Sequence, residues 1–519
     1  MQAIRCSTLG LLRSTATVSA MTMISRVLGF VRDMVIARLF GATMGADAFF
    51  VAFKIPNFLR RLFAEGAFSQ AFVPVFSEYK SRRDHAQVQR LADEVAGTLG
   101  ALLFGVTLIG VIAAPLLVML FAPGFLADAH KYDLTVEMLR ITFPYLLFVS
   151  LTALAGGILN IYGQFWVSAF TPVFLNLAMI GAMVWMAPHL DDPVVSLAWG
   201  VFIAGVVQLL FQFPFLRRLK LLPRPRWGWR QEGVRRIMKL MLPSLFGSSV
   251  AQISLLVDTI IASFLVTGSV SWLYYSDRLV EFPLGVFGVA LATVILPSLS
   301  QQHGQASREA FAQTLDWGLR WVMLVGTPAM VGLLVLAGPM LITLFQYGAY
   351  GPHDVEMSSR SMMAYALGLL AFMLIKVLAP GFYARQDTHT PVRIGLIALG
   401  AGMVLKAALV LLLAHAGLAL SSSLAAFLNA WLLYRALRRE EVYRPGQGWW
   451  RLMGKLAFAN GAMAAVLWWG ARDWSQWMAW HGMERVMYLT LWIALGAAIY
   501  FACLWLMGVR YRDFRQKAK

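Results

Sequence analysis

Charged residues are scarce in this sequence. Of its 519 residues, 13% are charged and 59% are hydrophobic, and the mean hydropathy is +0.67. A soluble chain of this size carries roughly a quarter charged residues, because its surface must be solvated. The composition therefore excludes a water-soluble globular protein and predicts a membrane protein.

Cysteine and the common catalytic motifs are also lacking. The two cysteines, Cys6 and Cys503, lie at opposite ends of the chain, which excludes a disulfide framework and a cysteine metal site. There is no P-loop, no HExxH motif, no CxxC pair and no GxSxG motif, and the eight histidines form no cluster. We therefore expect no enzyme, no metal and no cofactor, and transport driven by membrane potential or an ion gradient.

What the sequence does have is a succession of long apolar blocks. Blocks of about 20 residues match the ~30 Å hydrocarbon core at 1.5 Å per helical residue. Arg26 and Arg32 interrupt the first block, so we expect it to remain as a helix and not to be a removable signal peptide. We predict an all-α polytopic membrane protein with fourteen transmembrane helices, near residues 13–40, 46–76, 93–121, 135–160, 166–187, 194–216, 240–266, 272–299, 313–345, 358–384, 391–414, 418–434, 452–470 and 486–508.

The basic residues between these blocks are distributed very unequally. The segments that would share a side with the N-terminus hold 29 Lys and Arg, whereas the opposite loops hold only Lys131, Arg472 and Arg485. Positive charge marks cytoplasmic loops. We therefore expect both termini in the cytoplasm. The net charge of +18 is explained by membrane topology and lipid headgroups, so no nucleic-acid partner is expected.

Three short motifs recur in the same order. Residues 33–37 resemble 258–262, 73–77 resemble 296–300 and 171–173 resemble 390–392, at offsets of 225, 223 and 219 residues. Repeats of six helices would insert in the same orientation and enclose a substrate site. We expect an N-terminal lobe at 1–218, a basic cytoplasmic linker at 219–239, a C-terminal lobe at 240–440, and the last two helices with a basic tail at 441–519.

Charged residues inside the first two blocks form the candidate site. A charge at the bilayer centre costs roughly 2.5–3.5 kcal/mol, so it must face water or a partner. On a helical wheel, five polar residues of the second block lie within about 80° of the circumference and form one stripe. The stripe comprises Asp47, Lys54, Asn57, Arg61 and Glu65. On the first block, the side chains of Arg32 and Asp33 should point in different directions.

These two blocks contain six basic residues and only three carboxylates. Unpaired positive charge favours an anion, and the planar fork of Arg suits phosphate oxygens. We therefore predict that Arg26, Lys54 and Arg61 bind a phosphate or pyrophosphate group.

In the eighth block, Arg278 could pair with Glu281, beside Asp277. The alternative, that such charges are interhelical ion pairs that hold the bundle together, stays open, most strongly for Asp33, Asp277 and Arg278. Asp258 is a candidate cation or proton site.

Four motifs suggest a family. Residues 25–33, 47–57 with 60–68, 274–283 and 376–387 closely resemble the MurJ (MviN) lipid II flippase family, within the multidrug/oligosaccharidyl-lipid/polysaccharide exporter superfamily. The resemblance implies two pseudo-symmetric six-helix lobes in a V around a central cavity, plus two extra C-terminal helices that form a lipid-tail groove. It adds Arg32, Asn57, Arg60 and Arg278 to the substrate-binding residues, and it assigns gating or charge pairing to Asp33, Asp47, Glu65, Asp277 and Glu281.

The resemblance also implies a function. It predicts movement of lipid II, an undecaprenyl-pyrophosphate-linked disaccharide-pentapeptide, from the cytoplasmic to the periplasmic leaflet by alternating access in the bacterial inner membrane. Its partners would be lipid II, membrane lipids and the peptidoglycan-synthesis machinery. The sodium ligands of some members are missing, because the eleventh block has Lys406 and neither Asn nor Asp. The alternatives are a flippase for another polyprenyl-linked glycan, a multidrug/cation antiporter, a membrane enzyme acting on polyprenyl phosphates, and a non-transporting scaffold.

Overall fold

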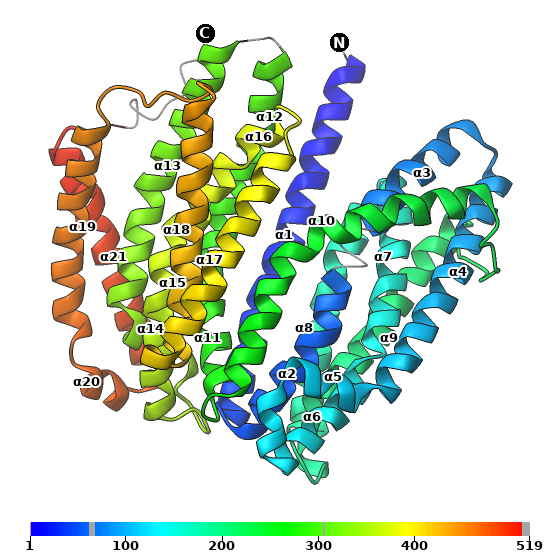
Figure 1. The fold of residues 1–519 in the computed structure, drawn as a ribbon, viewed down its shortest axis with the longest axis horizontal. Helices are drawn as coiled ribbons and strands as arrows, with labels where there is room; N and C mark the ends of the chain where they lie inside the picture. Colours follow the sequence, from blue (N-terminus) through cyan, green and yellow to red (C-terminus); the bar gives the residue numbers. More distant parts are fainter. Residues whose placement is uncertain (1, 62–67, 305–306, 511–519) are drawn as a thin grey trace. The chain divides into compact units, whose positions relative to one another are not determined.

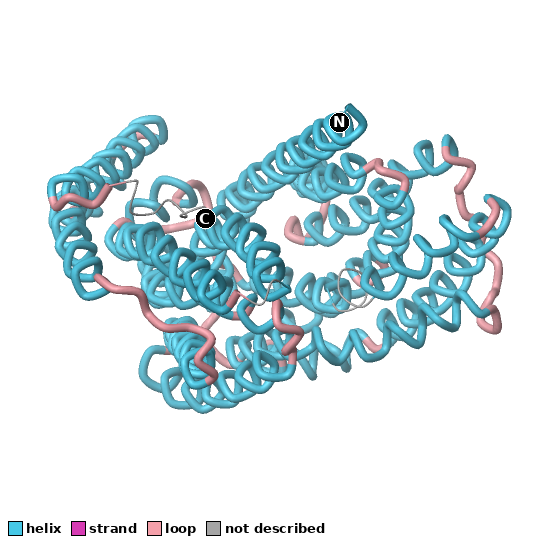
Figure 2. Tube along the Cα trace, turned by 90° about the horizontal axis from the view of Figure 1, so that it is seen from above, coloured by secondary structure: helices cyan, strands magenta, loops and turns pink. Residues whose placement is uncertain are grey.

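The described chain is helical. The computed structural model describes residues 2–61, 68–304 and 307–510. Within these ranges there are helices, short turns and loops, and no β-strand (Figure 2). The predicted all-α class is confirmed. The chain divides into two compact units, Met1–Val270 and Ser271–Lys519, each of which is described by itself.

The first unit is a bundle in which α8 packs against α1 and α9, and α7 packs against α9 (Figure 1). Helix α2 packs against α6, and α10 runs along α3. Its elements are α1 (Gln2–Phe40), α2 (Met44–Arg60), α3 (Ser69–Arg82), α4 (His85–Ile112), α5 (Ala114–Phe121), η2 (Pro123–Ala127), α6 (Ala129–Thr142), α7 (Tyr145–Ile161), α8 (Phe165–Trp185), η3 (Ala187–His189), α9 (Val195–Arg218) and α10 (Glu232–Ser263).

The second unit is built around α15, which packs against α18 and α13. The rings of Tyr275, Phe345 and Tyr350 form a buried aromatic cluster, with centroids 5.1, 5.3 and 6.1 Å apart. Its elements are α11 (Ser269–Pro283), the π-helix η4 (Leu284–Gly288), α12 (Val289–Gly304), α13 (Arg308–Val335), α14 (Ala337–Phe345), α15 (Pro352–Leu378), α16 (Pro380–Tyr383), α17 (His389–Leu413), α18 (His415–Arg439), α19 (Trp449–Ala471), α20 (Trp474–Ala479) and α21 (Gly482–Leu506).

The membrane-crossing character of the chain is shown by its most apolar helices. Nine helical spans in the described ranges are long and apolar enough to cross a bilayer. The fourteen predicted blocks all coincide with helical structure where it is described. The helices outside the nine apolar spans, which include α1 and α2, carry embedded charges or are shorter. The chain is therefore a multi-pass membrane protein, and the count of fourteen spans stays a prediction.

Helix starts recur at constant spacing in the two units. Helices α4 and α13 begin 223 residues apart, as do α5 and α14, and α6 and α15. These correspondences support the predicted internal repeat beyond its three sequence motifs.

The grouping of α10 differs from the expected lobes. We expected residues 240–266 to belong to the C-terminal lobe, but α10 clusters with the first unit. The physical reason is its contacts, since α10 packs against α3, α4, α5 and η2. The segment that joins α9 to α10, residues 219–231, is hereafter the α9–α10 linker.

Candidate functional site

Arg32 lies in the middle of a buried polar cluster on α1. Its side chain is 8% exposed, and its Nη2 and Nε atoms lie 2.6 and 3.0 Å from Asp33 Oδ1. Its Nη1 atom donates to Asn176 Oδ1 at 3.0 Å. The expectation that Arg32 and Asp33 look in different directions is therefore wrong, because the long Arg side chain folds back to its neighbour. A charge this desolvated needs such pairing.

Asn176 is a site residue that our sequence reasoning missed. It comes from α8, and besides holding Arg32 it donates from Nδ2 to the carbonyl oxygen of Ser25 at 3.0 Å. The amide thus joins α8 to α1 at two levels of α1. The available signal was an isolated amide in the apolar run 166–187, where an unsatisfied polar group would be costly.

Arg26 contrasts with Arg32. It follows Ser25 on α1 and is half-buried. Within the described part of the chain it makes no hydrogen bond and no ion pair. Its guanidinium therefore keeps all five donors available for an incoming acceptor.

The stripe on α2 changes from buried to exposed along its length. Lys54 and Asn57 are half-buried, and Lys54 has interactions within the protein. Asn57 Oδ1 accepts a hydrogen bond from Arg60 Nε at 2.8 Å, so these two predicted residues are brought together. Arg61 is exposed and, among the described residues, has no hydrogen bond or ion pair. Glu65 lies outside the described residues.

Asp47, at the beginning of α2, is fully engaged within the first unit. Its carboxylate is buried and accepts from Lys131 Nζ at 3.1 Å and from the Gly268 backbone N–H at 2.7 Å. The Lys131 ammonium also lies 4.1 Å from the centre of the Phe125 ring. We counted Lys131 as a loop residue, but it is buried in the first turn of α6. Asp47 therefore serves charge pairing, as one of the two predicted alternatives.

The second unit contributes an exposed pair. Arg278 Nη1 lies 3.2 Å from Glu281 Oε2, and their side chains are 31% and 56% exposed. The predicted pairing is therefore present, and Asp277 beside it also has interactions within the protein. Lys376 on α15 is exposed, whereas Lys406 on α17 is buried and engaged.

Asp258 on α10 is the remaining candidate. It is half-buried, its Oδ1 atom is enclosed without a hydrogen bond, and the residue has other interactions in the protein. No group of three or more His, Cys, Asp or Glu capable of holding a metal ion occurs in the described ranges. The cation role of Asp258 stays a prediction.

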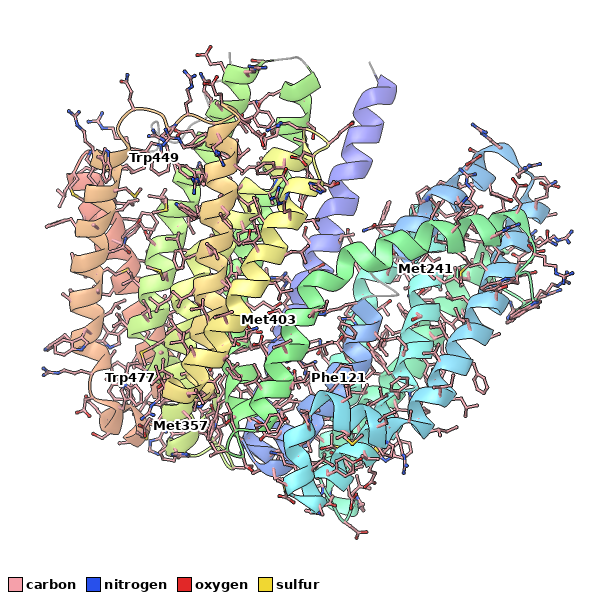
Figure 3. All side chains as sticks on the ribbon, in the orientation of Figure 1. Phe121, Met241, Met357, Met403, Trp449 and Trp477 are labelled. Atoms are coloured by element: carbon pink, nitrogen blue, oxygen red, sulfur yellow. The ribbon has the colours of Figure 1, made fainter. Side chains whose placement is uncertain are left out.

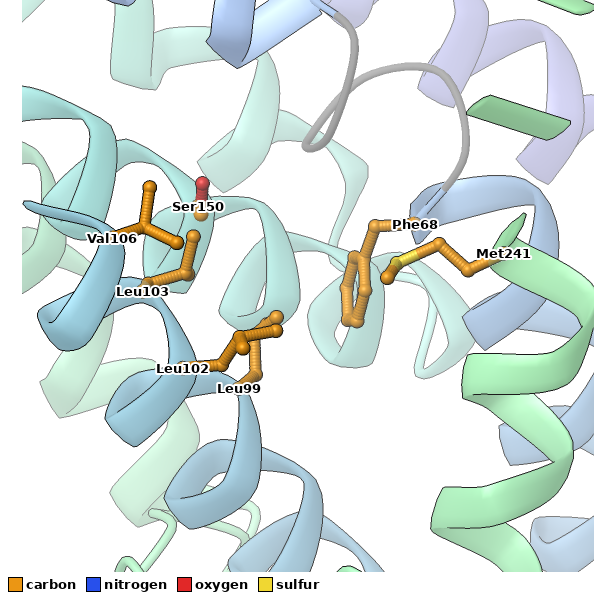
Figure 4. A pocket seen from close by; sticks show the side chains of 7 residues that line it. All are labelled: Phe68, Leu99, Leu102, Leu103, Val106, Ser150 and Met241. Atoms are coloured by element: carbon orange, nitrogen blue, oxygen red, sulfur yellow. The ribbon is translucent and has the colours of Figure 1, made fainter. Parts of the chain in front are cut away.

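A small cavity in the first unit has the wrong chemistry for an anion. It has a volume of about 30 Å³ and lies among α4, α7, α10 and the residue before α3 (Figure 4). Its walls are apolar except for Ser150, and they include Leu99, Leu103 and Met241. Such a space cannot hold a diphosphate, so the cationic residues of α1 and α2 remain the candidate site.

The helical fold is shared with solved structures whose titles name membrane transporters. A solved structure titled "Inward-facing conformation of a multidrug resistance MATE family transporter of the MOP superfamily" shares the fold, with a TM-score of 0.64 and 15% identity over 82% of this chain and 98% of that one. A structure titled "Lipid II flippase MurJ, inward closed conformation" matches with a TM-score of 0.79 and 25% identity, covering 96% of this chain and 99% of that one.

Sequence comparison gives the particular family. The family described as lipid II flippase MurJ matches residues 36–488. A probable lipid II flippase MurJ of Vibrio cholerae is 52% identical over 97% of this chain and 98% of its own length. A lipid II flippase MurJ of Burkholderia cenocepacia is 44% identical over 98% of this chain and all of its own length. The chain belongs to the lipid II flippase MurJ family, as its motifs suggested.

Proposed function

We propose that this protein is a lipid II flippase and that Arg26 and Arg61 bind the pyrophosphate of its substrate. Relatives that carry this name match nearly the whole chain. The observation that carries the residue assignment is the absence, within the described ranges, of an internal partner for either guanidinium. Cationic side chains in membrane-embedded segments are functional candidates by default.

The other basic residues of α1 and α2 have supporting roles in this proposal. Lys54 adds positive charge on the α2 stripe, and Arg60 orients the amide of Asn57. Arg32 is neutralised by Asp33, so we assign it to positioning α1 against α8 and not to first contact with the anion. This assignment removes Arg32 from the residues that we expect to contact the pyrophosphate directly.

We further propose alternating access driven by the membrane potential. A charge that crosses the whole potential changes energy by about 2.3 kcal/mol per 100 mV. Export of an anionic headgroup and return of an empty cationic site both follow that field. The two six-helix lobes around a central cavity, the inner-membrane location, the cytoplasmic termini, and the roles of Arg278, Glu65, Asp277 and Glu281 belong to the same proposal.

Flipping by the reconstituted protein tests the assignment. Lipid II is incorporated into proteoliposomes, and its arrival in the outer leaflet is followed with a membrane-impermeant lipid II-binding probe. Arg26→Ala and Arg61→Ala should each slow flipping by tenfold or more, because hydrogen bonds to charged groups contribute about 1.5–3 kcal/mol. Arg38→Ala is the matched control, since Arg38 is an exposed arginine of α1 that lies on another face.

Three results would contradict the proposal. Native flipping rates in both variants would show that these arginines do not bind the pyrophosphate. Equal flipping of lipid II and of an undecaprenyl-pyrophosphate carrying an unrelated glycan would favour the alternative of a general polyprenyl-glycan flippase. A multidrug antiporter would show no lipid II movement at all in the unmodified protein.

A further inference from the structure

The α9–α10 linker is fastened to one face of α4. The Arg224 N–H donates to Asp93 Oδ1 at 2.8 Å, and the Arg226 N–H donates to the Asp93 carbonyl oxygen at 3.0 Å. Five residues further along α4, the Gly228 N–H donates to Thr98 Oγ1 at 3.0 Å. Three backbone donors within the five residues 224–228 are thereby fixed, so the linker has a defined conformation on the helix.

Two glycines allow this close approach. A Cβ atom on Gly97 of α4 would overlap the backbone of Arg226. A Cβ atom on Gly228 would lie 2.5 Å from Glu94 Cβ. Real Cβ contacts of that length do not occur, so the linker backbone is seated directly on the helix here, and the side chains of residues 224–227, 229 and 230 are exposed.

The outward side of the linker combines aromatic and cationic groups. Trp227 and Trp229 are 70% and 47% exposed, and their rings stack with centroids 6.3 Å apart. Arg224, Arg226 and Arg230 are exposed as well. Within the described chain none of these three guanidinium groups makes an ion pair or a side-chain hydrogen bond. The surface therefore presents positive charge without internal compensation.

The attachment points set the depth of the linker. Asp93 and Thr98 directly precede the apolar block that begins at Leu99, about 9 Å further along the helix from Asp93 at helical rise. Beyond this point α4 exposes Phe104, at 60%, and other large apolar side chains. The linker thus lies at the level where the hydrocarbon core begins, which is the zone that tryptophan prefers and where lipid phosphates lie.

We propose that the α9–α10 linker is a binding site for anionic phospholipid headgroups of the surrounding leaflet. Its three arginines pair with headgroup phosphates, and the two tryptophans lie among the glycerol and upper acyl regions. Charge complementarity favours an anionic lipid over a zwitterionic one, and the exposed rings favour a membrane over a soluble acidic protein. This site is separate from the proposed transport residues, and its failure would leave the transport proposal untouched.

Lipid titration of the full-length protein in detergent tests the site. Short-chain phosphatidylglycerol is titrated into fluorescently labelled protein, and its dissociation constant is compared with that of short-chain phosphatidylcholine. Replacing Arg224, Arg226 and Arg230 together by Gln should weaken phosphatidylglycerol binding by about tenfold or more at low salt, where polybasic attraction is strongest. The matched control replaces Arg439, Arg451 and Lys455 by Gln, which removes the same charge from the second unit and should change binding less than twofold.

A second variant and a competition experiment complete the test. W227A/W229A should weaken the binding of both phosphatidylglycerol and phosphatidylcholine, because it removes the uncharged contact with the membrane interface. Equal losses in the linker and control variants would overturn the proposal, since binding would then reflect net charge alone. Inorganic phosphate competing at the same concentration as the lipid would also overturn it, because the site would then recognise a free anion. Size-exclusion profiles identical to that of the unmodified protein establish that the variants fold.

Discussion

At the scale of single residues, two arginines six positions apart on α1 have opposite environments. Arg32 is buried and paired, whereas Arg26 has no internal partner in the described chain. A helical wheel fixes where Cβ points, but the Arg head lies several bonds further out and selects its own partner. The sequence could therefore predict which helices carry charge, but not that Arg32 would turn to Asp33 and Asn176.

Removing the carboxylate of this cluster should destabilise the protein strongly. Asp33→Asn leaves the Arg32 charge buried and uncompensated, for which a loss of about 3–5 kcal/mol is typical. Thermal unfolding in detergent should show a large fall in midpoint. The control is Glu281→Gln, which opens an exposed pair worth about 0–1 kcal/mol. Equal midpoints for the two variants would mean that the Arg32 cluster is not a structural centre.

At the scale of helices, prolines create free carbonyl groups that neighbouring helices use. Pro56 cannot donate to the Ala52 carbonyl oxygen, and the Thr142 hydroxyl lies 3.4 Å from it. Pro328 likewise frees the Leu324 carbonyl oxygen, which accepts from the Tyr500 hydroxyl at 2.8 Å. The prolines were visible in the sequence, but the compensating hydroxyls lie far along the chain, so the pairing could not be predicted.

Tyr500→Phe should loosen the attachment of α21 to α13. It leaves the Leu324 carbonyl oxygen without its donor in a buried position, at a cost of about 1–3 kcal/mol. The unfolding midpoint should fall measurably. Tyr434→Phe is the control, because the Tyr434 hydroxyl makes no hydrogen bond to the described residues. An unchanged midpoint for Tyr500→Phe would contradict the role of this bond.

The connection between α18 and α19 is organised by one carboxylate. Asp316 on α13 accepts from Tyr443, Gly446 and Trp449 at 2.8, 3.1 and 2.7 Å, and it pairs with Arg320 at 2.7 Å. Burial, followed by the bond to Asp316, raises the pKa of Tyr443 well above its usual range, so its phenol stays a donor. Trp449 and Trp477 flank α19 at its two ends (Figure 3).

Asp316→Ala should therefore release this connection. Cleavage by trypsin after the exposed Arg444 is expected to become several-fold faster, because protection follows local opening. Limited proteolysis followed by mass spectrometry of the fragments measures this rate. Glu356→Ala, which opens an exposed pair with Arg360, should not change it. Unchanged cleavage in Asp316→Ala would show that other contacts hold the connection.

At the scale of the whole molecule, hydropathy predicted the helical membrane class and the motifs predicted the family, and both are confirmed. Neither could predict the grouping of α10 with the first unit, because that depends on packing between segments distant in the chain. Hydropathy also could not distinguish a charged span from a buried polar helix, and the charge asymmetry predicts a sidedness that stays untested, so the fourteen-span topology needs measurement.

Site-directed labelling tests that topology. In a variant with Cys6 and Cys503 replaced by Ser, single cysteines are introduced as Ser81→Cys and Ser475→Cys, both outside the predicted transmembrane helices, near the end of α3 and in the short helix α20. An impermeant thiol reagent applied from outside spheroplasts should label position 475 and leave position 81 unlabelled. The reason is the distribution of 29 basic residues against three. Labelling of position 81 from outside would contradict the two crossings predicted before it, and absence of labelling at position 475 would contradict the thirteen predicted before that position.

The constant interval of 223 residues between corresponding helix starts has an evolutionary meaning. It is the mark expected of an ancestral half-length gene that was duplicated and fused. Residues at equivalent positions have since diverged, as His85 and Arg308 at the starts of α4 and α13 illustrate. Over the block from α4 to the start of α6, however, neither copy has gained or lost a net residue relative to the other. In this block the two copies therefore agree in segment length although residues at equivalent positions differ.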